Sequence, residues 1–386
     1  MEDFRHRILK RDPALIKQII PESLSAVIYN PDDADNTIVS AFLMIKGPRF
    51  FTYKNDGDIA EISAFLKQSG YESKRVVILK KYPGRLFQKC PGSPNMICCN
   101  YRLINTCFNC MYDCSYCFLN SYLNSYGITQ FIEFESLRNE VYQNLNDDNM
   151  IYRVGTGEYT DSLLMDGITG TSGFLMESFS GKKNVLLEFK TKSDEINHLL
   201  KLKHAANTVL AWSLNTERNY LKYESGCASI KNRIKAASKA ASSGFYLAFH
   251  FDPIIIYPGA IEEYLDLVDL LFSEIDPSVI LWISMGVLRY SPGFKDIVLD
   301  KKNRSDLFTG EMFPGADGKY RYLKRDRVLF YKKMVEKIRS YALKPFIYLC
   351  MESSDVWKSV FAMDISTSDE LENIFSTHLK REFFSR

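Results

Sequence analysis

Three cysteines lie close together in the segment Cys110-Met-Tyr-Asp-Cys114-Ser-Tyr-Cys117. Thiolates are soft ligands that suit zinc or iron–sulfur clusters. A zinc site normally takes four ligands from paired Cys-x2-Cys arms, and the chain has no further pair of this kind far from the segment. Three thiolates in one tight loop instead suit three irons of a four-iron, four-sulfur cluster, which leaves the fourth iron open. The segment therefore predicts a [4Fe-4S] cluster with an open, catalytic coordination position.

A basic segment near the C-terminus could contact nucleic acid. Residues 319–339 carry nine Lys or Arg against two acids, interleaved with aromatic residues. Cations beside aromatic rings suit phosphate contacts and base stacking. The alternative for the helical part is a solvated basic face behind an apolar stripe. We therefore place the candidate nucleic-acid contacts in the loop that leads into the helix, at Lys319, Arg321, Lys324, Arg325 and Arg327.

Strand-like and helix-like segments that could position these residues alternate from residue 100 onward. Continuous apolar strands separated by helices indicate a parallel sheet covered by helices. The expected strands are 100–105, 150–157, 184–191, 208–215, 246–254, 278–287 and 345–351, and the expected helices are 136–145, 193–202, 229–244 and 260–275. Six or seven such units predict an α/β fold with a partial (β/α)6-type barrel. In such barrels the site groups lie on the loops that follow the strands.

The domain boundaries follow from these patterns. Residues 1–99 are predicted to form a small α/β domain, with strands at 25–30 and 75–81 and a helix at 59–70. Residues 100–360 are predicted to form the barrel, and residues 361–386 a C-terminal helical tail.

The sequence has neither a membrane-spanning run nor a signal-peptide pattern, so we expect a cytoplasmic protein. The 386 residues are 46% hydrophobic with a formal net charge of +2, which by itself implies no nucleic-acid or membrane partner. No run of about eighteen apolar residues occurs, and the first residues lack the apolar stretch of a signal peptide. Seven of the nine cysteines lie between Cys90 and Cys117. In a reducing cytosol such clustering indicates metal or redox chemistry rather than disulfides.

The spacing Cys-x3-Cys-x2-Cys, with Tyr116 just before the third cysteine and the first barrel strand before the loop, resembles the radical S-adenosylmethionine superfamily. The resemblance implies that S-adenosylmethionine binds the open iron and is cleaved reductively to a 5′-deoxyadenosyl radical. It also implies an electron donor such as a flavodoxin or ferredoxin. Cys107-x2-Cys110 does not match this spacing, so we expect Cys107 not to be a ligand.

Several groups after the expected strands could hold S-adenosylmethionine. The segment 155–158 (GTGE) is similar to the superfamily motif that meets the ammonium group, and glycine lets the backbone approach a ligand closely. A lysine at 192 could pair with the carboxylate, and polar residues at 213 and 215 offer hydrogen bonds. For each, a solvated loop residue or a strand cap is the alternative. The candidate cofactor contacts are Tyr116, Gly157, Glu158, Lys192, Ser213 and Asn215.

The stretch 97–124, together with YRVGTGEYTDSL, SLNT and YLCMESSDVW, resembles the spore photoproduct lyase family from about residue 75 to the end. The founding members of that family split a methylene-bridged thymine dimer in DNA. The resemblance implies a carbon–carbon lyase of DNA repair, with the three motif cysteines as cluster ligands. It also implies that Lys192 and Ser213 contact S-adenosylmethionine.

One departure from the family concerns the hydrogen-atom donor. The spore enzymes place a cysteine just after the second strand, and Glu158 stands at that place here. A carboxylate cannot donate a hydrogen atom as a thiol can, so Tyr159, Cys227 or Cys350 would have to do so. Our candidate catalytic residues are Tyr116, Glu158 and Tyr159.

Two other functions stay open at this point. A radical enzyme of this type could act on a peptide, a nucleoside or a small metabolite. A zinc-dependent nucleic-acid-binding protein that is not an enzyme would use Cys107 as a fourth ligand. Colour separates the two classes, because an iron–sulfur protein is brown and a zinc protein is colourless.

Overall fold

The structure is a computed structural model that describes residues 24–384, except 124, 135, 146, 203–206, 303–304 and 309. The expectation about a signal peptide concerns residues that lie outside this range. Within the described residues, no helix is long and apolar enough to cross a membrane.

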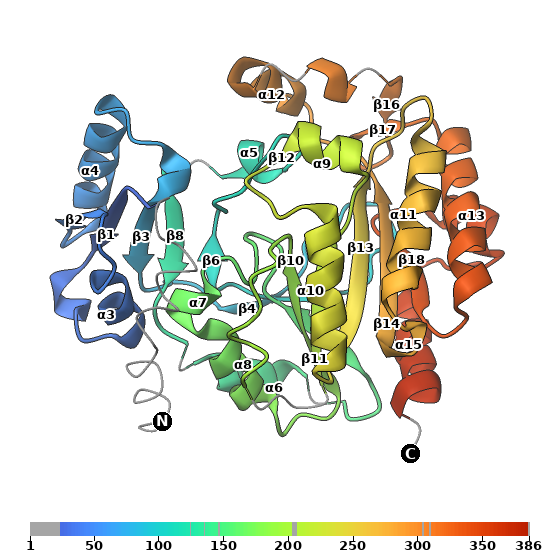
Figure 1. Cartoon of the computed structure of the whole chain (residues 1–386), viewed down its shortest axis with the longest axis horizontal. Helices are drawn as coiled ribbons and strands as arrows, with labels where there is room; N and C mark the ends of the chain where they lie inside the picture. Colours follow the sequence, from blue (N-terminus) through green and yellow to red (C-terminus); the bar gives the residue numbers. More distant parts are fainter. Residues whose placement is uncertain are drawn as a thin grey trace.

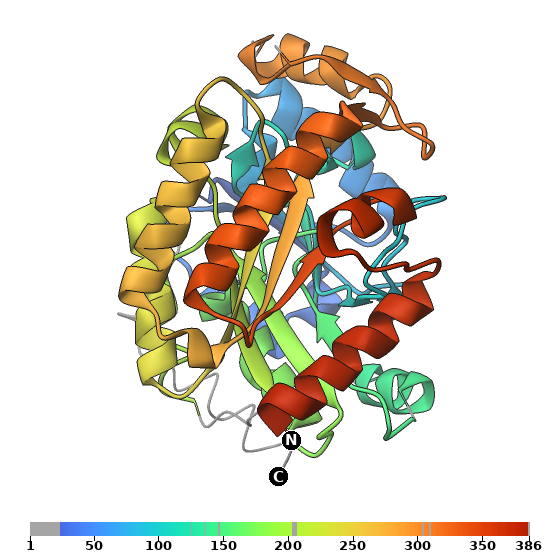
Figure 2. The same ribbon diagram turned by 90° about the vertical axis from the view of Figure 1, so that its right-hand side faces the viewer.

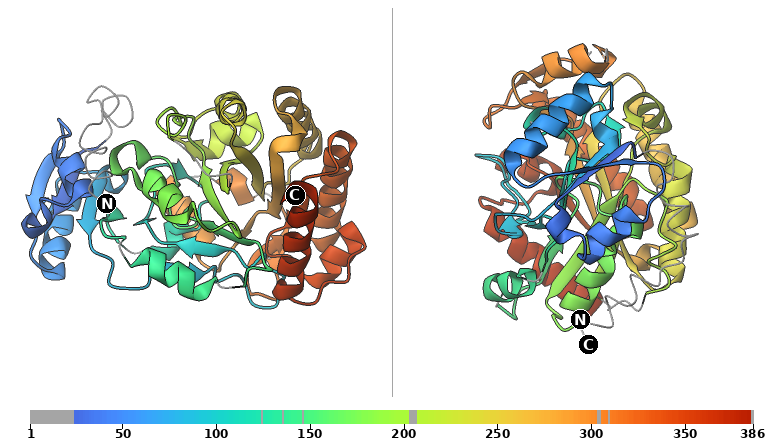
Figure 3. Two further views of the ribbon diagram at one scale, coloured as in Figure 1. Left: turned by 90° about the horizontal axis from the view of Figure 1, so that it is seen from below. Right: turned by 90° about the vertical axis from the view of Figure 1, so that its left-hand side faces the viewer.

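An open, curled sheet of eight strands forms the centre of the described structure (Figures 1 and 3). The strands are β4 (Phe87–Lys89), β5 (Arg102–Ile104), β9 (Tyr152–Gly155), β10 (Val185–Thr191), β11 (Thr208–Ser213), β13 (Tyr246–Ile254), β14 (Ile280–Val287) and β18 (Phe346–Leu349). From β5 to β18 they pair in parallel and in chain order, and β4 pairs antiparallel with β5. The predicted α/β partial barrel is confirmed.

Helices cover the outer face of this sheet (Figure 2). They include α6 (Leu137–Asn144), α8 (Thr171–Phe179), α10 (Ile230–Ser242), α11 (Ala260–Glu274), α13 (Lys324–Tyr341) and α15 (Ser368–Leu379). The sequence of α10 shows why a helix forms there. The Ser229 side chain caps its first turn by accepting a hydrogen bond from Asn232 N, and Gly244, at φ 87°, follows its end.

The helix predicted at 193–202 is wrong, because this stretch forms turns. Ser193 N donates to Thr191 Oγ1 at 2.9 Å, and Glu195 N donates to Ser193 Oγ at 3.0 Å. Such local side-chain bonds give the backbone an alternative to helical hydrogen bonds. The shorter helices α5 (Leu119–Tyr122), α7 (Asp166–Thr169), α9 (Glu217–Tyr223), α12 (Phe294–Lys302) and α14 (Ser354–Phe361) were not predicted.

A second sheet lies at one end of the molecule (Figure 3). Its strands, in the order β2-β1-β3-β8-β6, are β2 (Arg49–Thr52), β1 (Ala26–Tyr29), β3 (Val76–Lys80), β8 (Ile128–Phe131) and β6 (Cys107–Phe108), with helices α3 (Thr37–Leu43) and α4 (Asp56–Gln68). Strand pairing crosses the predicted boundary at residue 99. β6 and β8 complete this sheet from beyond the boundary, whereas β4 joins the barrel sheet from before it.

Side-chain contacts between strands that are not neighbours show which residues face the inside of the curled sheet. Arg153 of β9 donates to the Tyr348 hydroxyl of β18 at 2.8 Å, and Glu188 of β10 lies 2.6 Å from His250 of β13. All four side chains are buried. Because side chains alternate along a strand, Lys190, Asp252 and Cys350, each two residues further on, face the same side nearer the carboxyl ends.

Candidate active site

Two short strand pairs hold the cysteine loop, one just before it and one at its middle cysteine. β6 pairs antiparallel with β8, and β7 (Asp113–Cys114) pairs antiparallel with β12 (Glu224–Ser225). Between them, Asn109 adopts φ 74°, a conformation that Asn tolerates better than most residues, and its side chain accepts from Cys110 N at 2.9 Å. The backbone of the loop is therefore fixed by the two sheets.

The three predicted ligands differ in exposure. Cys114 is buried, and Cys110 and Cys117 are partly exposed. Burial raises the pKa of the Cys110 and Cys117 thiols. In the ranges described, no group of three His, Cys, Asp or Glu side chains converges on a point that would hold one metal ion. A [4Fe-4S] cluster takes each thiolate on a separate iron, and the three cysteines of the loop supply three such ligands.

A buried ionic network lies beside Cys114, the middle motif cysteine. The Tyr116 hydroxyl and the Arg233 guanidinium both donate to the Glu224 carboxylate. The Lys192 ammonium lies 5.7 Å from the centre of the Tyr116 ring. Burial alone would lower the pKa of Lys192, but the nearby Cys114 and Glu224 outweigh it and raise that pKa. A cation therefore lies beside the cysteine loop. The Tyr116 hydroxyl already donates its hydrogen bond to Glu224, within the protein.

A second thiol lies against the middle motif cysteine. The sulfurs of Cys114 and Cys227 are 3.6 Å apart. The hydrogen bond from the Cys227 thiol, more than the Lys192 charge, holds the pKa of Cys114 below its usual range, whereas burial and Cys114 raise the pKa of Cys227.

Steric constraints explain the glycines after β9. A Cβ on Gly155 would lie 1.8 Å from the Tyr101 hydroxyl oxygen and 2.7 Å from the Glu188 carbonyl oxygen. A Cβ on Gly157 would lie 2.9 Å from Lys190 Cβ. These contacts are with the neighbouring strand and with the barrel interior. Both glycines are thus required by protein packing, whatever ligand the loop holds.

Asp161, which the sequence analysis did not single out, joins the loop after β9 to the end of β10. Its carboxylate accepts from the Thr191 hydroxyl and from Lys192 N, each at 2.7 Å. It also accepts from the backbone of Leu163 and Leu164. Asp161 therefore positions the backbone of the predicted cofactor-binding lysine. The sequence carried a local signal for this role of Asp161, because Asp commonly caps turns through its own carboxylate.

The other predicted contacts fall in different environments. Tyr159 is buried and stacks on Tyr122, with ring centres 5.8 Å apart. Asn215 uses its amide to hold the loop, accepting from the Tyr264 hydroxyl and donating to the Pro253 carbonyl, so its contacts favour the strand-cap alternative. Ser213 ends β11 beside the network, where its carbonyl accepts from Arg233.

Glu158 and four other partly exposed residues surround the open end of the barrel interior. The four are Lys190, Asp252, Arg289 and Cys350. The Arg289 guanidinium donates to both oxygens of Asp252 at 3.2 Å, and its Nη2 lies 3.5 Å from the Cys350 sulfur. Lys190 completes the set, and the charge of Glu158 helps to raise its pKa against the effect of burial. Strand alternation would have found Asp252 and Cys350. Arg289 lies beyond the end of β14, so no periodic pattern predicts it.

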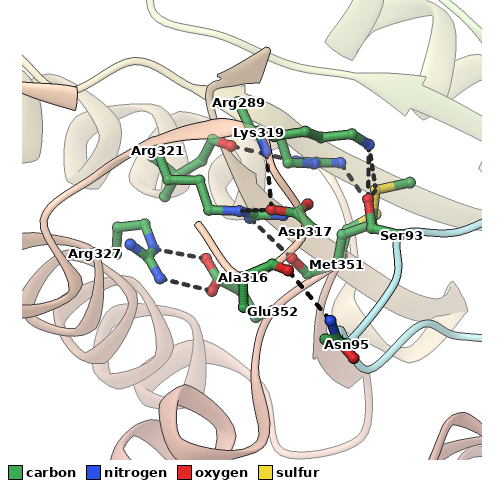
Figure 4. Close-up of polar contacts among 12 residues, drawn as sticks. Ser93, Asn95, Arg289, Ala316, Asp317, Lys319, Arg321, Arg327, Met351 and Glu352 are labelled. Atoms are coloured by element: carbon green, nitrogen blue, oxygen red, sulfur yellow. Dashed lines mark hydrogen bonds and ion pairs between the residues drawn. The ribbon is translucent and has the colours of Figure 1, made fainter. Parts of the chain in front are cut away.

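Contacts divide the five predicted nucleic-acid-binding residues, three of which, Lys319, Arg321 and Arg327, are labelled in Figure 4. Arg321 and Arg327 are buried and paired with Asp317 and Glu352, respectively. They fasten β17 (Tyr320–Tyr322) and α13 to the end of β18. Arg321 and Arg327 therefore do not face a ligand at the surface. The exposed cations Lys324 and Arg325, together with Lys319, stay as the predicted contacts. Lys319 Nζ donates to Ser93 Oγ at 2.7 Å, and burial followed by the nearby Arg289 lowers its pKa.

Comparison with known proteins places the chain in a family. A sequence profile described as "Spore photoproduct lyase" matches residues 98–347. The chain belongs to the spore photoproduct lyase family. This confirms the resemblance noted in the cysteine segment and implies membership of the radical S-adenosylmethionine superfamily.

Relatives in this family align with only part of this chain in sequence. The spore photoproduct lyase of Bacillus subtilis (strain 168) is 32% identical over 120 residues, which cover 31% of this chain and 35% of that protein. The enzyme of Clostridium acetobutylicum is 26% identical over 218 residues, which cover 52% and 59%. These matches thus cover about a third to three fifths of the relatives' length.

Solved structures of spore photoproduct lyase share the fold. A spore photoproduct lyase complexed with dinucleoside spore photoproduct aligns with a TM-score of 0.70 at 19% identity, covering 86% of this chain and 99% of that one. A double mutant of spore photoproduct lyase with bound AdoMet and dinucleoside spore photoproduct aligns with a TM-score of 0.71 at 19% identity, covering 86% and 100%.

Proposed function

We propose that this chain is a radical S-adenosylmethionine lyase that cleaves a carbon–carbon bond in a pyrimidine photoproduct of DNA. The observation that carries the proposal is the three-cysteine loop, pinned between two sheets with the Lys192 cation beside it. Family membership supports the reaction type. The many free cysteines suit a reducing cytoplasm, and a flavodoxin or ferredoxin would supply the electron.

The loop would hold a [4Fe-4S] cluster through Cys110, Cys114 and Cys117. When bound, the cluster supplies the electron that cleaves S-adenosylmethionine to methionine and the 5′-deoxyadenosyl radical. Lys192 would neutralise the methionine carboxylate. The backbone at Gly157 and the carboxylate of Glu158 would receive the ammonium group. Ser213 is well placed to contribute a hydrogen bond from the end of β11.

Removal of a hydrogen atom from the substrate leaves a carbon radical that a hydrogen atom must finally quench. Of Cys350, Cys227 and Tyr159, Cys350 fits this role best, because it faces the open end of the barrel interior beside Arg289. Cys227 lies against Cys114, on the side of the Glu224–Arg233 network, and Tyr159 is packed among aromatic rings. The substrate radical would take hydrogen from the Cys350 thiol. The resulting sulfur radical would regain an electron from a flavodoxin or ferredoxin and a proton from water.

The burial of Arg321 and Arg327 favours a second candidate, a radical enzyme for a smaller substrate, because it removes two of the five expected phosphate contacts. Anaerobic turnover with ultraviolet-irradiated DNA, followed by mass spectrometry, tests the first candidate. Restored thymines together with 5′-deoxyadenosine support it. Cleavage of S-adenosylmethionine without any change in the DNA would favour the smaller substrate. A colourless protein that contains zinc would overturn both.

A further inference from the structure

The backbone, and not only a side-chain rotamer, brings Cys227 to Cys114. In the pairing of β7 with β12, Cys114 lies opposite Glu224. Cys227 N then donates to the Glu224 carbonyl at 3.2 Å, which turns the chain back toward the cysteine loop. The next residue, Ala228, donates from its backbone to the Lys192 carbonyl at 3.1 Å. Cys227 is therefore held between the cysteine loop and the segment that carries Lys192.

The Cys227 thiol is buried against the Cys114 sulfur. Cys227 is only 8% exposed, Cys114 is 7% exposed, and their sulfurs are 3.6 Å apart. A thiol donates a weak hydrogen bond, and a metal-bound thiolate sulfur accepts one. Once Cys114 binds iron it has no proton to give, so Cys227 must be the donor. Because the contact is buried, water does not compete for it.

We propose that Cys227 is a positioning residue for the cluster, whose thiol donates a hydrogen bond to the Cys114 sulfur and raises the reduction potential. The inference rests on the cluster assignment in the proposed function. Reduction adds negative charge to the cluster, and a donor to a ligand sulfur stabilises the more negative state. Cys227 thereby makes the electron transfer that starts each turnover more favourable, without touching S-adenosylmethionine or the substrate.

A redox titration of reconstituted protein, followed by electron paramagnetic resonance, tests this proposal. Cys227→Ala should keep its iron content and show a lower midpoint potential. We expect an approximately tenfold smaller ratio of reduced to oxidised cluster at a fixed potential, which equals about 59 mV for a one-electron couple. Cys227→Ser retains a donor and should stay closer to the wild type. Cys98→Ala is the matched control for loss of a thiol outside this contact, and its potential should not change.

A second measurement does not depend on comparing potentials. Electron–nuclear double resonance of the reduced wild-type cluster in deuterated water should show an exchangeable deuteron that is missing in Cys227→Ala. An unchanged potential together with an unchanged deuteron signal would overturn the proposal, and so would loss of iron from Cys227→Ala, which would make Cys227 a ligand. A wild-type chain that binds no cluster would overturn it along with the proposed function. A normal cluster with no activity on DNA would overturn only the DNA substrate.

Discussion

At the scale of single residues, the candidate site combines cations and thiols whose roles depend on their neighbours. Lys192 lies beside Tyr116 and Cys114, whereas Lys190, two residues earlier, is at the open end of the barrel interior. Cys350 and Cys227 are both thiols outside the motif, yet Cys350 faces the barrel interior and Cys227 faces the sulfur of Cys114, a predicted ligand. Single substitutions should therefore separate cofactor binding from the later steps.

Lys192→Ala should weaken binding of S-adenosylmethionine by about 1–3 kcal/mol, the cost of losing a hydrogen bond to a charged group. The visible spectrum of the cluster should not change, because Lys192 is not a ligand. Equilibrium binding to the reconstituted protein measures the effect. Lys192→Arg keeps the charge and should lose less affinity. Equal affinity in wild type and Lys192→Ala would show that the side chain does not reach the cofactor.

Cys350→Ala should uncouple cofactor cleavage from product formation. In deuterated water the wild-type thiol carries deuterium, so the repaired thymine should gain one deuterium atom. The variant should still form 5′-deoxyadenosine but yield much less repaired, deuterium-labelled thymine. Mass spectrometry of both products measures this. Normal deuterium transfer in Cys350→Ala would assign the donor role to another group.

At the scale of elements, the strand ends are held together by contacts that cross the barrel. Gly155 lets β9 pass close to the Tyr101 hydroxyl and the Glu188 carbonyl, and the Glu188 side chain reaches His250 two strands away. Asp161 then ties the following loop to the end of β10. The geometry of the site thus depends on packing inside the barrel as much as on the loop residues.

Gly155→Ala should destabilise the protein by about 1–3 kcal/mol, because its Cβ would overlap Tyr101 and a backbone carbonyl that cannot easily move. Denaturant unfolding measures the loss. Gly181→Ala is the matched control, since the nearest atom to its Cβ would be the Tyr142 hydroxyl at 3.8 Å. Equal stability of the two variants would contradict the close approach of β9 to Tyr101.

The buried Glu188 carboxylate should make stability depend on acid. Burial alone would raise its pKa, but His250 and Arg153 outweigh burial and lower it from 4.5 to about 2. Because the folded pKa is depressed, the contribution is present above pH 4.5 and is lost as the pH falls toward about 2. The difference corresponds to about 3 kcal/mol at about 1.36 kcal/mol per pKa unit.

Unfolding of wild type and Glu188→Gln at several pH values between 4.5 and 2 tests this expectation. The free energy of unfolding should fall more steeply for the wild type than for Glu188→Gln. Parallel curves would mean that the carboxylate has the same pKa in the folded and unfolded chains.

At the scale of the whole molecule, buried ion pairs join the basic segment to the end of the barrel. Arg327 donates to both oxygens of Glu352 at 3.0 and 3.1 Å, and Ile97 forms a bridge with the same residue from the segment before the cysteine loop. The exposed cations on the first turn of α13 are Lys324 and Arg325. Binding at the surface by Lys324 and Arg325 can therefore be tested separately from the buried pairing of Arg327 within this short segment.

Replacing Lys324 and Arg325 together by Ala should lower the salt dependence of DNA binding by about two phosphate contacts, because each contact releases condensed counterions. Arg327→Ala should instead destabilise the fold by about 3–5 kcal/mol, since it leaves the buried Glu352 unpaired. Binding measured across a salt series, together with unfolding curves, separates the two effects. A stable Arg327→Ala protein with a reduced salt slope would reverse this assignment.

Local patterns in the sequence predict the ligand set and determined most of the fold. The spacing of Cys110, Cys114 and Cys117 is a property of one short segment, and apolar runs between helices define the barrel strands because periodicity is local. Strand alternation from His250 also suffices to place Asp252 on the inner face. The helix expected at 193–202 failed because two hydroxyl groups near the end of β10 form competing turns.

Only the tertiary structure decided which groups are free to act, because pairing joins residues far apart in the chain. It buried Arg327 against Glu352 while leaving Arg325 exposed, although the two cations belong to the same basic pattern. It brought Arg289 to Cys350 and set Cys227 against Cys114 over 113 residues of sequence. No local propensity encodes such contacts. They arise when the parallel strands curl and bring their carboxyl ends to one side of the barrel.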